Sequence, residues 1–393
     1  MSDSPRIGLK FGLIASLALG TPSFTQGQEN PQAEASILDR LTIQPGGLVQ
    51  MRYTANRREP PAGEHAWIQG FQLSRVRLTL RSTYDDRASV YVRAGTDAGG
   101  SFRIERALVD LYFGSTILRV GQFYLPGDAE LEPSAGRTLT SDYSPTGYTL
   151  EPGSSQGGMA IFEPGKWRVS VAATAGMRAG FSQSGDQSRA DIAGTAYFEH
   201  RFIGDDWGPF GVHSSPSESP TALKAGIGMT YQTGGNTGDT DSLTAMYASA
   251  DVQVLGSGWN VLGEFKLLRT TPHEADVIGT GQRFTDLGFL VQGGMFVNRR
   301  VEIFLRYDHL IPDGKARSPG FVQGTGTEEF RTATSGLNFY VIPESSLAKL
   351  TVDFQYMFDA QSTSIVSPVF NSGVFESTGR QWTVRVQWVA SLG

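Results

Sequence analysis

Apolar and polar residues alternate one by one along most of the chain from about Leu41 onward. Near the C-terminal end, in residues 382–388, tryptophan and valine alternate with threonine, arginine and glutamine. A period of two is the pattern of a β-strand whose two faces meet different surroundings. Helical periodicity is almost absent, so the pattern predicts an all-β protein.

About sixteen runs of this kind follow one another, an even number, as single-chain bacterial outer-membrane barrels have. They predict strands at residues 41–53, 70–83, 88–95, 102–113, 117–123, 156–163, 167–176, 191–204, 223–232, 242–254, 259–270, 284–297, 301–309, 329–342, 348–358 and 380–389. Most runs are about 8–14 residues long, which is enough for a tilted strand to cross a bilayer. The sequence therefore predicts a transmembrane antiparallel β-barrel.

The connections between these runs differ in length in a regular way. They are mostly long after odd-numbered strands, as at 124–155 and 310–328, and mostly short after even-numbered ones. The short ones are rich in Gly, Asp, Asn, Ser and Pro, which tight turns need. Long external loops and short periplasmic turns are the arrangement of outer-membrane barrels. Residues 205–222 break the rule, which indicates either a misplaced strand boundary or an enlarged turn.

The polar face of the strands differs from that of a soluble β-sandwich, which also alternates but turns its apolar face inward. Here the polar face is rich in arginine and carboxylates, as the wall of a water-filled channel would be. The alternation gives seven candidate pore-lining anion contacts: Arg75, Arg77, Arg81, Arg93, Arg119, Arg306 and Arg385. Guanidinium groups match phosphate and carboxylate in charge and shape.

These arginines admit two interpretations. They could attract anions, or they could pair with lumen carboxylates and brace the wall, since buried charges are usually paired. The carboxylates available for such pairing are Asp110, Asp251, Glu264, Asp308 and Asp353. Arg75, Arg77 and Arg81 share one strand face and repel one another unless an anionic group is near, which favours a weak preference for anions.

The N-terminal residues have the organisation of a signal peptide. Arg6 and Lys10 precede a short apolar core at 11–20, and polar or small residues follow up to Gly27. This predicts a signal peptide at 1–27, a periplasmic segment at 28–40 and the barrel at 41–393, located in the cell outer membrane. A retained interfacial segment is the alternative.

Composition narrows the possible functions. There is no cysteine and no run of about 18–20 apolar residues, so neither a disulfide framework nor a spanning helix is expected. The net charge is −6, and a mildly acidic chain is a poor candidate for binding nucleic acid. The five histidines are scattered along the chain, so we expect no catalytic residues, no metal site and no cofactor.

Three segments resemble the phosphate-selective porin O and P family of outer-membrane channels. They are 72–80 (QLSRVRLTL), 106–113 (RALVDLYF) and 119–126 (RVGQFYLP), and their order and spacing also match. Beyond Glu163 the likeness is one of architecture only. The resemblance implies a sixteen-stranded channel, usually a homotrimer, whose third long loop folds inward to narrow the pore.

In this resemblance the third long loop carries the constriction. Its candidate residues are Asp128, Glu130, Glu132 and Arg137. Three acids against one arginine fit poorly with a strongly anion-selective constriction. A second departure lies at the C-terminus, because residues 389–393 follow Trp388 in place of the terminal aromatic that such chains usually have.

Together these features predict an outer-membrane porin that allows passive diffusion of small hydrophilic solutes, with anions or phosphate as the preferred ones. Its partners would be outer-membrane lipid and those solutes. Two alternatives stay open. One is a secreted soluble β-rich glycan-binding module, and the other is a barrel enzyme in which His200 or His309 would pair with a serine.

Overall fold

The computed structural model divides into two units, Met1–Leu41 and Thr42–Gly393. The described residues are 40–97, 100, 102–180, 192–234, 243–273, 281–314, 329–361 and 373–392. Nearly all of the first unit lies outside them, and so do the predicted signal peptide at 1–27 and most of the predicted segment at 28–40.

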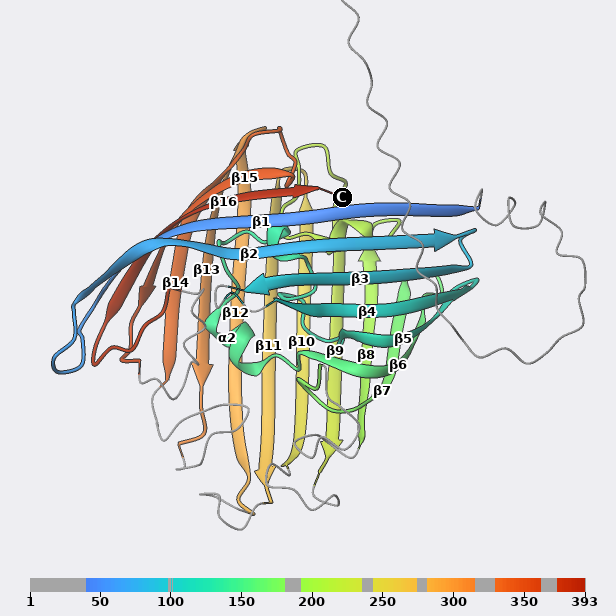
Figure 1. The fold of residues 1–393 in the computed structure, drawn as a ribbon, viewed down its shortest axis with the longest axis horizontal. Coiled ribbons are helices and arrows are strands. Elements are labelled where there is room, and N and C mark those ends of the chain that lie inside the picture. Colours follow the sequence, from blue (N-terminus) through green and yellow to red (C-terminus); the bar gives the residue numbers. More distant parts are fainter. Residues whose placement is uncertain are drawn as a thin grey trace, which may run out of the picture. The chain divides into compact units, whose positions relative to one another are not determined.

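The second unit is a closed antiparallel β-barrel (Figure 1). Its described residues form sixteen strands, each next to its neighbours in chain order, and β1 closes the barrel against β16. The strands are β1 (Leu41–Arg58), β2 (Trp67–Tyr84), β3 (Ala88–Asp97), β4 (Phe102–Phe113), β5 (Thr116–Tyr124), β6 (Ser154–Phe162), β7 (Trp167–Thr174), β8 (Ile192–Ile203), β9 (Ala222–Thr233), β10 (Leu243–Gly256), β11 (Trp259–Pro272), β12 (Phe284–Asn298), β13 (Val301–Ile311), β14 (Phe330–Tyr340), β15 (Ala348–Met357) and β16 (Gln381–Leu392). This confirms the predicted fold, and every strand overlaps the run that predicted it.

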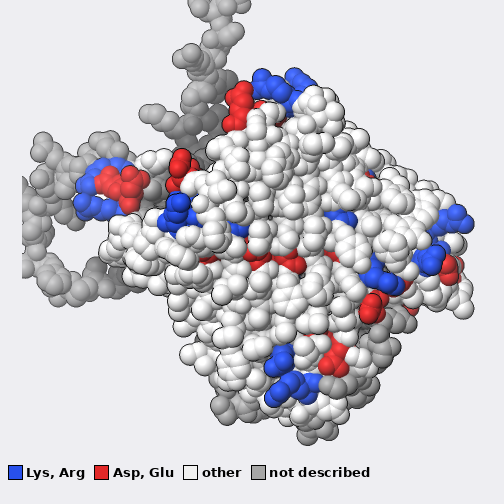
Figure 2. All heavy atoms as spheres, turned by 180° about the vertical axis from the view of Figure 1, so that it is seen from behind, with Lys and Arg blue, Asp and Glu red and all other residues white. Residues whose placement is uncertain are grey.

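The alternation sorts side chains between the two faces of the wall. On β9, for example, Lys224 points inward and is fully buried, whereas Ile227 points outward and is 62% exposed. Large apolar residues are exposed on the outer face of most strands. Most of the surface in Figure 2 carries no charged side chain, and the charged residues lie in a few separate groups. An apolar exterior around a polar interior is what a barrel embedded in lipid requires.

The connections differ in length as predicted. At one end of the barrel, here called the turn end, β2 and β3 are joined by residues 85–87, in which Asp85 and Asp86 have φ of 45° and 53°. This left-handed conformation suits the twist of a hairpin, and Asp adopts it more readily than most residues. The opposite end, here called the loop end, carries the long connections. The first of these is shorter than predicted, because β1 continues to Arg58.

Residues 204–221, here called the enlarged turn, lie at the turn end. The neighbouring strands end at Ile203 and begin at Ala222, close to the predicted limits, so the connection is a longer turn rather than a misplaced strand. It contains the 3₁₀ helix η2 (Gly208–Gly211), whose Phe210 is buried in a cluster with Ala222 and Leu255. Apolar burial therefore packs this turn against the barrel.

The last strand extends beyond its predicted end. β16 continues to Leu392, which pairs with Gly47 of β1. The residues after Trp388 are thus part of the wall, with Val389 buried inside and Leu392 75% exposed outside. An outward leucine therefore lies near the end of the strand, where the family resemblance implies an aromatic residue.

Candidate pore and constriction

Residues 125–153, here called the constriction loop, fold into the barrel. The loop contains the 3₁₀ helix η1 (Ala135–Arg137) and the α-helix α2 (Pro145–Leu150), and most of its residues are buried. α2 lies against β11, β12 and β13 (Figure 1). None of the helices in the described ranges is long and apolar enough to cross a membrane. The inward path of the loop agrees with the expectation from the family resemblance.

A glycine on β12 allows α2 to approach the wall. A Cβ built on Gly288 would come within 2.6 Å of the Leu150 side chain and would also overlap Thr146, both of which belong to α2. Any larger residue would therefore push the helix away from the strand. Nearby, the hydroxyl of Tyr247 on β10 donates a hydrogen bond to the carbonyl of Gly127 (2.9 Å), which holds the start of the loop.

Two acidic residues near the start of the loop, Asp128 and Glu132, are bound by lysines of the wall. Asp128 forms an ion pair with Lys266 of β11 (2.6 Å), and Lys266 also approaches Glu264 at 3.3 Å. Glu132 lies 3.2 Å from Lys224 of β9. The negative charge at these loop positions is therefore balanced at the wall.

Arginines of β1 and β13 bind two further acids of the loop, Glu130 and Asp142. Glu130 accepts hydrogen bonds from both the backbone and the hydroxyl of Ser144 (2.6 Å each) and lies 3.4 Å from Arg306 of β13. Asp142 forms a buried ion pair with Arg52 of β1 (2.9 Å). Four of the five acids of the loop, all except Glu151, thus attach it to the barrel. Of these four, Glu132 is the one with substantial exposure (41% of its side chain).

Arg306 and Arg385 do not have the predicted place beside the pore. Their exposed fractions are 1% and 0%, because both lie between the constriction loop and the wall. Arg306 donates to Thr140 Oγ1 and to the Asp142 carbonyl (2.8 Å each), and Arg385 donates to Asp353 (2.7 Å). These two arginines position the loop. Arg385 has the pairing with Asp353 that the second interpretation of the sequence expects, whereas Arg306 contacts the constriction loop instead of one of the five wall carboxylates.

The other five predicted arginines lie together on the inner face of β2–β5, and Arg106 of β4 joins them. This group, here called the arginine ladder, consists of Arg75, Arg77, Arg93, Arg106, Arg81 and Arg119. The strand register sets their order, because Arg77 is opposite Gly95, Arg93 is opposite Arg106, and Arg81 is opposite Tyr91. Successive levels are two residues apart, or roughly 6.6 Å, so the ladder runs from the middle of the barrel toward the turn end.

Few carboxylates balance the part of the ladder nearest the middle of the barrel, which Arg75, Arg77 and Arg93 form. Arg77 and Arg93 share Glu105, at 2.7 and 2.8 Å. Arg75 donates instead to neutral groups, the amide oxygen of Gln50 (2.9 Å) and the hydroxyl of Tyr148 (3.3 Å). Three guanidinium groups therefore face one directly paired carboxylate at this level.

The part of the ladder nearer the turn end contains two arginines without a carboxylate partner among the described residues. Arg106 lies 4.3 Å from the ring centre of Tyr124, and its Nε has no hydrogen-bond partner in the described chain. Arg81 lies 5.2 Å from the ring centre of Tyr91. Arg119, in contrast, makes a two-point contact with Asp110, at 2.7 and 2.9 Å.

Sequence reasoning missed Arg106, although a signal was present. Arg106, Leu108, Asp110 and Tyr112 share one strand face, and three of these four residues are polar. An apolar Leu108 on that face hides the alternation, and a register shift opposite Arg93 and Ala94 changes the phase of β4 just before it.

A cavity of about 400 Å³ lies between the constriction loop and the inner faces of β4–β8. Arg81, Arg106 and Arg119 of the ladder line it. Most acids around it are paired, as Glu163 is with Arg168 (2.6 Å). The cavity therefore offers a solute two arginines, Arg81 and Arg106, that have no acidic partner among the described residues.

Burial shifts the pKa values of Glu151 and His213, two of the titratable groups that lie outside the strands. Burial raises the pKa of Glu151, which borders the cavity just after α2, to about 7, against the opposing effect of Arg178. Burial lowers the pKa of His213, in the enlarged turn, to about 4. The neutral His213 ring fits its contacts, since Nε2 lies 3.4 Å from the Ala129 carbonyl and Nδ1 lies 3.2 Å from the Gln292 amide nitrogen.

Arg137, the fourth predicted constriction residue, has an exposed side chain. Its carbonyl accepts a hydrogen bond from the backbone of His213 (3.1 Å). The enlarged turn thus supports the constriction loop from the turn end, at Ala129 and at Arg137. This contact gives the long connection at 204–221 a structural role.

The barrel and its inward loop together define the fold class of bacterial porins. An anion-selective porin from Comamonas acidovorans is similar in structure, with a TM-score of 0.63, 14% identity and coverage of 90% of this chain and 100% of that one. OmpF of Salmonella typhi, solved with daunomycin, has a TM-score of 0.55 and 10% identity over 90% and 98% of the two chains. OprB of Pseudomonas putida has a TM-score of 0.54 and 14% identity over 92% and 96%. No protein-family model and no curated protein matches the sequence.

Proposed function

We propose that the protein is an outer-membrane porin that allows small hydrophilic solutes to diffuse passively and that prefers anions. The apolar exterior, the inward loop and the porin fold support the channel function. The preference for anions rests on one observation. Four of the five acids of the constriction loop, all except Glu151, pair with Lys266, Lys224, Arg306 and Arg52 of the wall. Arg81 and Arg106, in contrast, border the cavity without an acidic partner among the described residues.

The acidic residues of the constriction loop are compatible with a preference for anions. A paired and buried carboxylate has little effect on a passing ion, because its wall cation cancels most of its field. An arginine that borders the cavity keeps its charge at any physiological pH. Among the described residues, Arg81 and Arg106 therefore bring positive charge without a paired acid to the place where a solute passes.

Two finer features belong to the same proposal. The protein forms a homotrimer, as the family resemblance implies, and a structure of the similar OmpT of Vibrio cholerae is described as a trimer form. Phosphate is one anion that the arginine ladder would accept, and the resemblance at 72–80, 106–113 and 119–126 favours it. Passage requires no reaction, so we assign no catalytic residue, metal or cofactor.

Conductance in planar bilayers tests the proposal. The purified protein should form ohmic channels, and the reversal potential in a KCl gradient should show a chloride preference. Arg81→Ala combined with Arg106→Ala should lower the chloride-to-potassium permeability ratio by roughly twofold or more, since one charge at about 8 Å in water contributes about 0.5 kcal/mol.

Arg299→Ala is the matched control, because it also removes a positive charge but from an exposed side chain in the turn between β12 and β13. It should leave the reversal potential unchanged. A protein that forms no conducting channel would overturn the porin function. A double variant with the wild-type reversal potential would overturn the role of the two arginines alone.

A further inference from the structure

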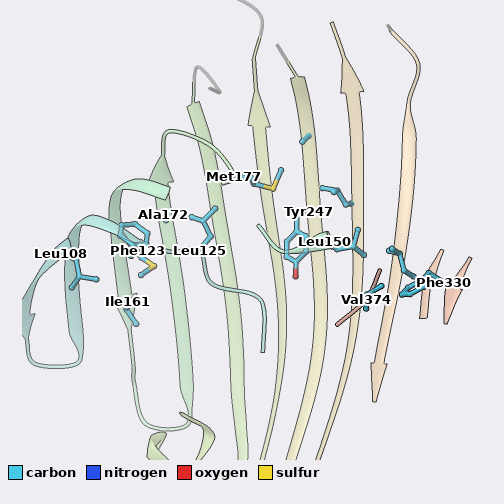
Figure 3. Close-up of a cluster of buried hydrophobic side chains, with 14 of the residues drawn as sticks. Leu108, Phe123, Leu125, Leu150, Ile161, Ala172, Met177, Tyr247, Phe330 and Val374 are labelled. Carbon is cyan, nitrogen blue, oxygen red and sulfur yellow. The ribbon is translucent and has the colours of Figure 1, made fainter. Parts of the chain in front are cut away.

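An apolar patch lines part of the cavity beside the arginine ladder. Leu108 of β4, Met159 and Ile161 of β6 and Phe123 of β5 all border it. Figure 3 shows Leu108, Phe123 and Ile161 near one another on neighbouring strands. These side chains point inward, toward the side of the wall that is otherwise mostly polar.

An inorganic ion would not bind to such a patch. Water and small hydrated ions gain nothing from apolar surface, and a wall that only had to be wet would carry polar residues at these positions. Apolar pockets with a few convergent polar groups are typical of sites that hold organic molecules. The volume of about 400 Å³ falls within the usual range for such sites.

Guanidinium groups border the patch directly. Arg106 precedes Leu108 by two residues on the same strand face, and Arg119 is the register partner of Met159. Arg106 also has an Nε without a hydrogen-bond partner among the described residues. A carboxylate can accept two parallel hydrogen bonds from a guanidinium group, which positions the rest of the molecule.

We propose that this cavity is a binding subsite for organic anions that join one carboxylate to an apolar or aromatic body. The carboxylate binds Arg106, and the apolar body lies against Leu108, Met159 and Ile161. This inference rests on the proposed porin function and names the class of solute. It separates such solutes from chloride, phosphate and acetate, which use the arginines alone.

A purely structural role for the patch gives a different expectation. Leu125 of the constriction loop belongs to the same buried cluster as Leu108, Phe123 and Met159. If the patch only packed the loop, solutes with and without an apolar body would behave alike. Comparison of two carboxylates of equal charge therefore separates the two roles.

The experiment measures block of the chloride current in planar bilayers by sodium benzoate and by sodium acetate. Benzoate should reduce the current at concentrations at least about tenfold lower than acetate, because it can bury a ring against the patch. Benzyl alcohol, which has the ring without the charge, should not block. Equal block by benzoate and acetate in conducting channels would overturn the inference and leave the porin function intact.

Variants then place the effect in the cavity. Met159→Gln and Leu108→Thr, each made separately, should bring the concentration of benzoate needed for block close to that of acetate. Met357→Gln is the control, because Met357 is an inward apolar residue on β15 that does not line this cavity. It should keep the preference for benzoate. A preference that survives in both cavity variants would overturn the assignment of the site.

Discussion

Each ionisable residue of the lumen acts according to the partner that the fold gives it. Asp128 and Glu264 lie beside Lys266, and Arg119 lies beside Asp110. Residue type alone therefore does not identify the charges that a solute meets. Glu151 is a separate case, because its raised pKa of about 7 makes its charge depend on pH.

The charge of Glu151 should make the ion preference of the channel depend on pH. Its carboxyl group is neutral below its pKa and becomes negative above it, so a negative charge appears beside the cavity as pH rises through about 7. The chloride preference should therefore fall between pH 6 and pH 8, by roughly twofold for one charge. Reversal potentials measured in that range check this.

Glu151→Gln is the control variant, because it keeps the shape and removes the titration. It should show a chloride preference that does not change between pH 6 and pH 8 and that equals the wild-type value at the acidic limit. An unchanged pH profile in the variant would assign the titration to another group.

The sequence predicted five arginines of the ladder, because alternation fixes the face of a strand on which a residue lies. It could not predict how charges pair. Ser141 binds Asp353 at a separation of 212 residues, and Glu130 approaches Arg306 across 176. Such contacts depend on the path of the loop through the lumen, which no local pattern specifies.

The strands and the constriction loop follow different physical rules. Strands are specified locally, by a period of two and by turn residues such as Asp85 and Asp86. The loop is specified by the wall that it meets, including Gly288, whose missing side chain leaves room for α2. This explains why the sixteen strands could be predicted whereas the contacts of the loop and the enlarged turn could not.

The contact between α2 and β12 can be tested at Gly288. Gly288→Leu should displace α2 from β12, because overfilling a packed contact costs about 1–3 kcal/mol. The constriction loop would then be less firmly held, and single-channel records should show a changed conductance and more frequent closures.

Gly263→Leu provides the comparison for this variant. Gly263 lies on the neighbouring β11, and nothing lies within 4 Å of a Cβ built on it. Its channels should resemble those of the wild type. Wild-type records from Gly288→Leu would show that the close approach of α2 to β12 has no effect on the pore.

At the scale of the whole molecule, burial in lipid must stabilise the barrel. The outer face carries exposed apolar residues such as Val291 on β12 (56% exposed), and this pattern would be unfavourable in water. The inner face holds the charges and their partners. The composition of the chain, with 39% hydrophobic residues, does not reveal this division, which appears only when alternate residues are separated.

The contact of the barrel with lipid can be tested by placing an arginine either near the bilayer centre or near the bilayer surface. Val291→Arg should lower the free energy of unfolding from lipid vesicles by about 2–4 kcal/mol, the usual cost of arginine on a lipid face near the bilayer centre. Leu347→Arg, in the turn between β14 and β15, should cost about 0–1 kcal/mol because it lies near the interface.

Urea titration of folding into vesicles, followed by tryptophan fluorescence, gives both values. Equal and small effects of the two variants would indicate that the outer face is not in contact with lipid. Such a result would favour the soluble β-rich alternative over a membrane barrel.

The attachment of the constriction loop also has a consequence for the order of assembly. The loop ends at residue 153, but its attachment involves both ends of the barrel sequence. Asp142 pairs with Arg52 of β1. Ser141 binds Asp353 of β15, which in turn pairs with Arg385 of β16. Contacts between residues so distant in the chain form late, since a large loop must close first. We therefore expect the loop to enter its final position only when β1 meets β16. Barrel closure and the formation of a working constriction would then be a single step.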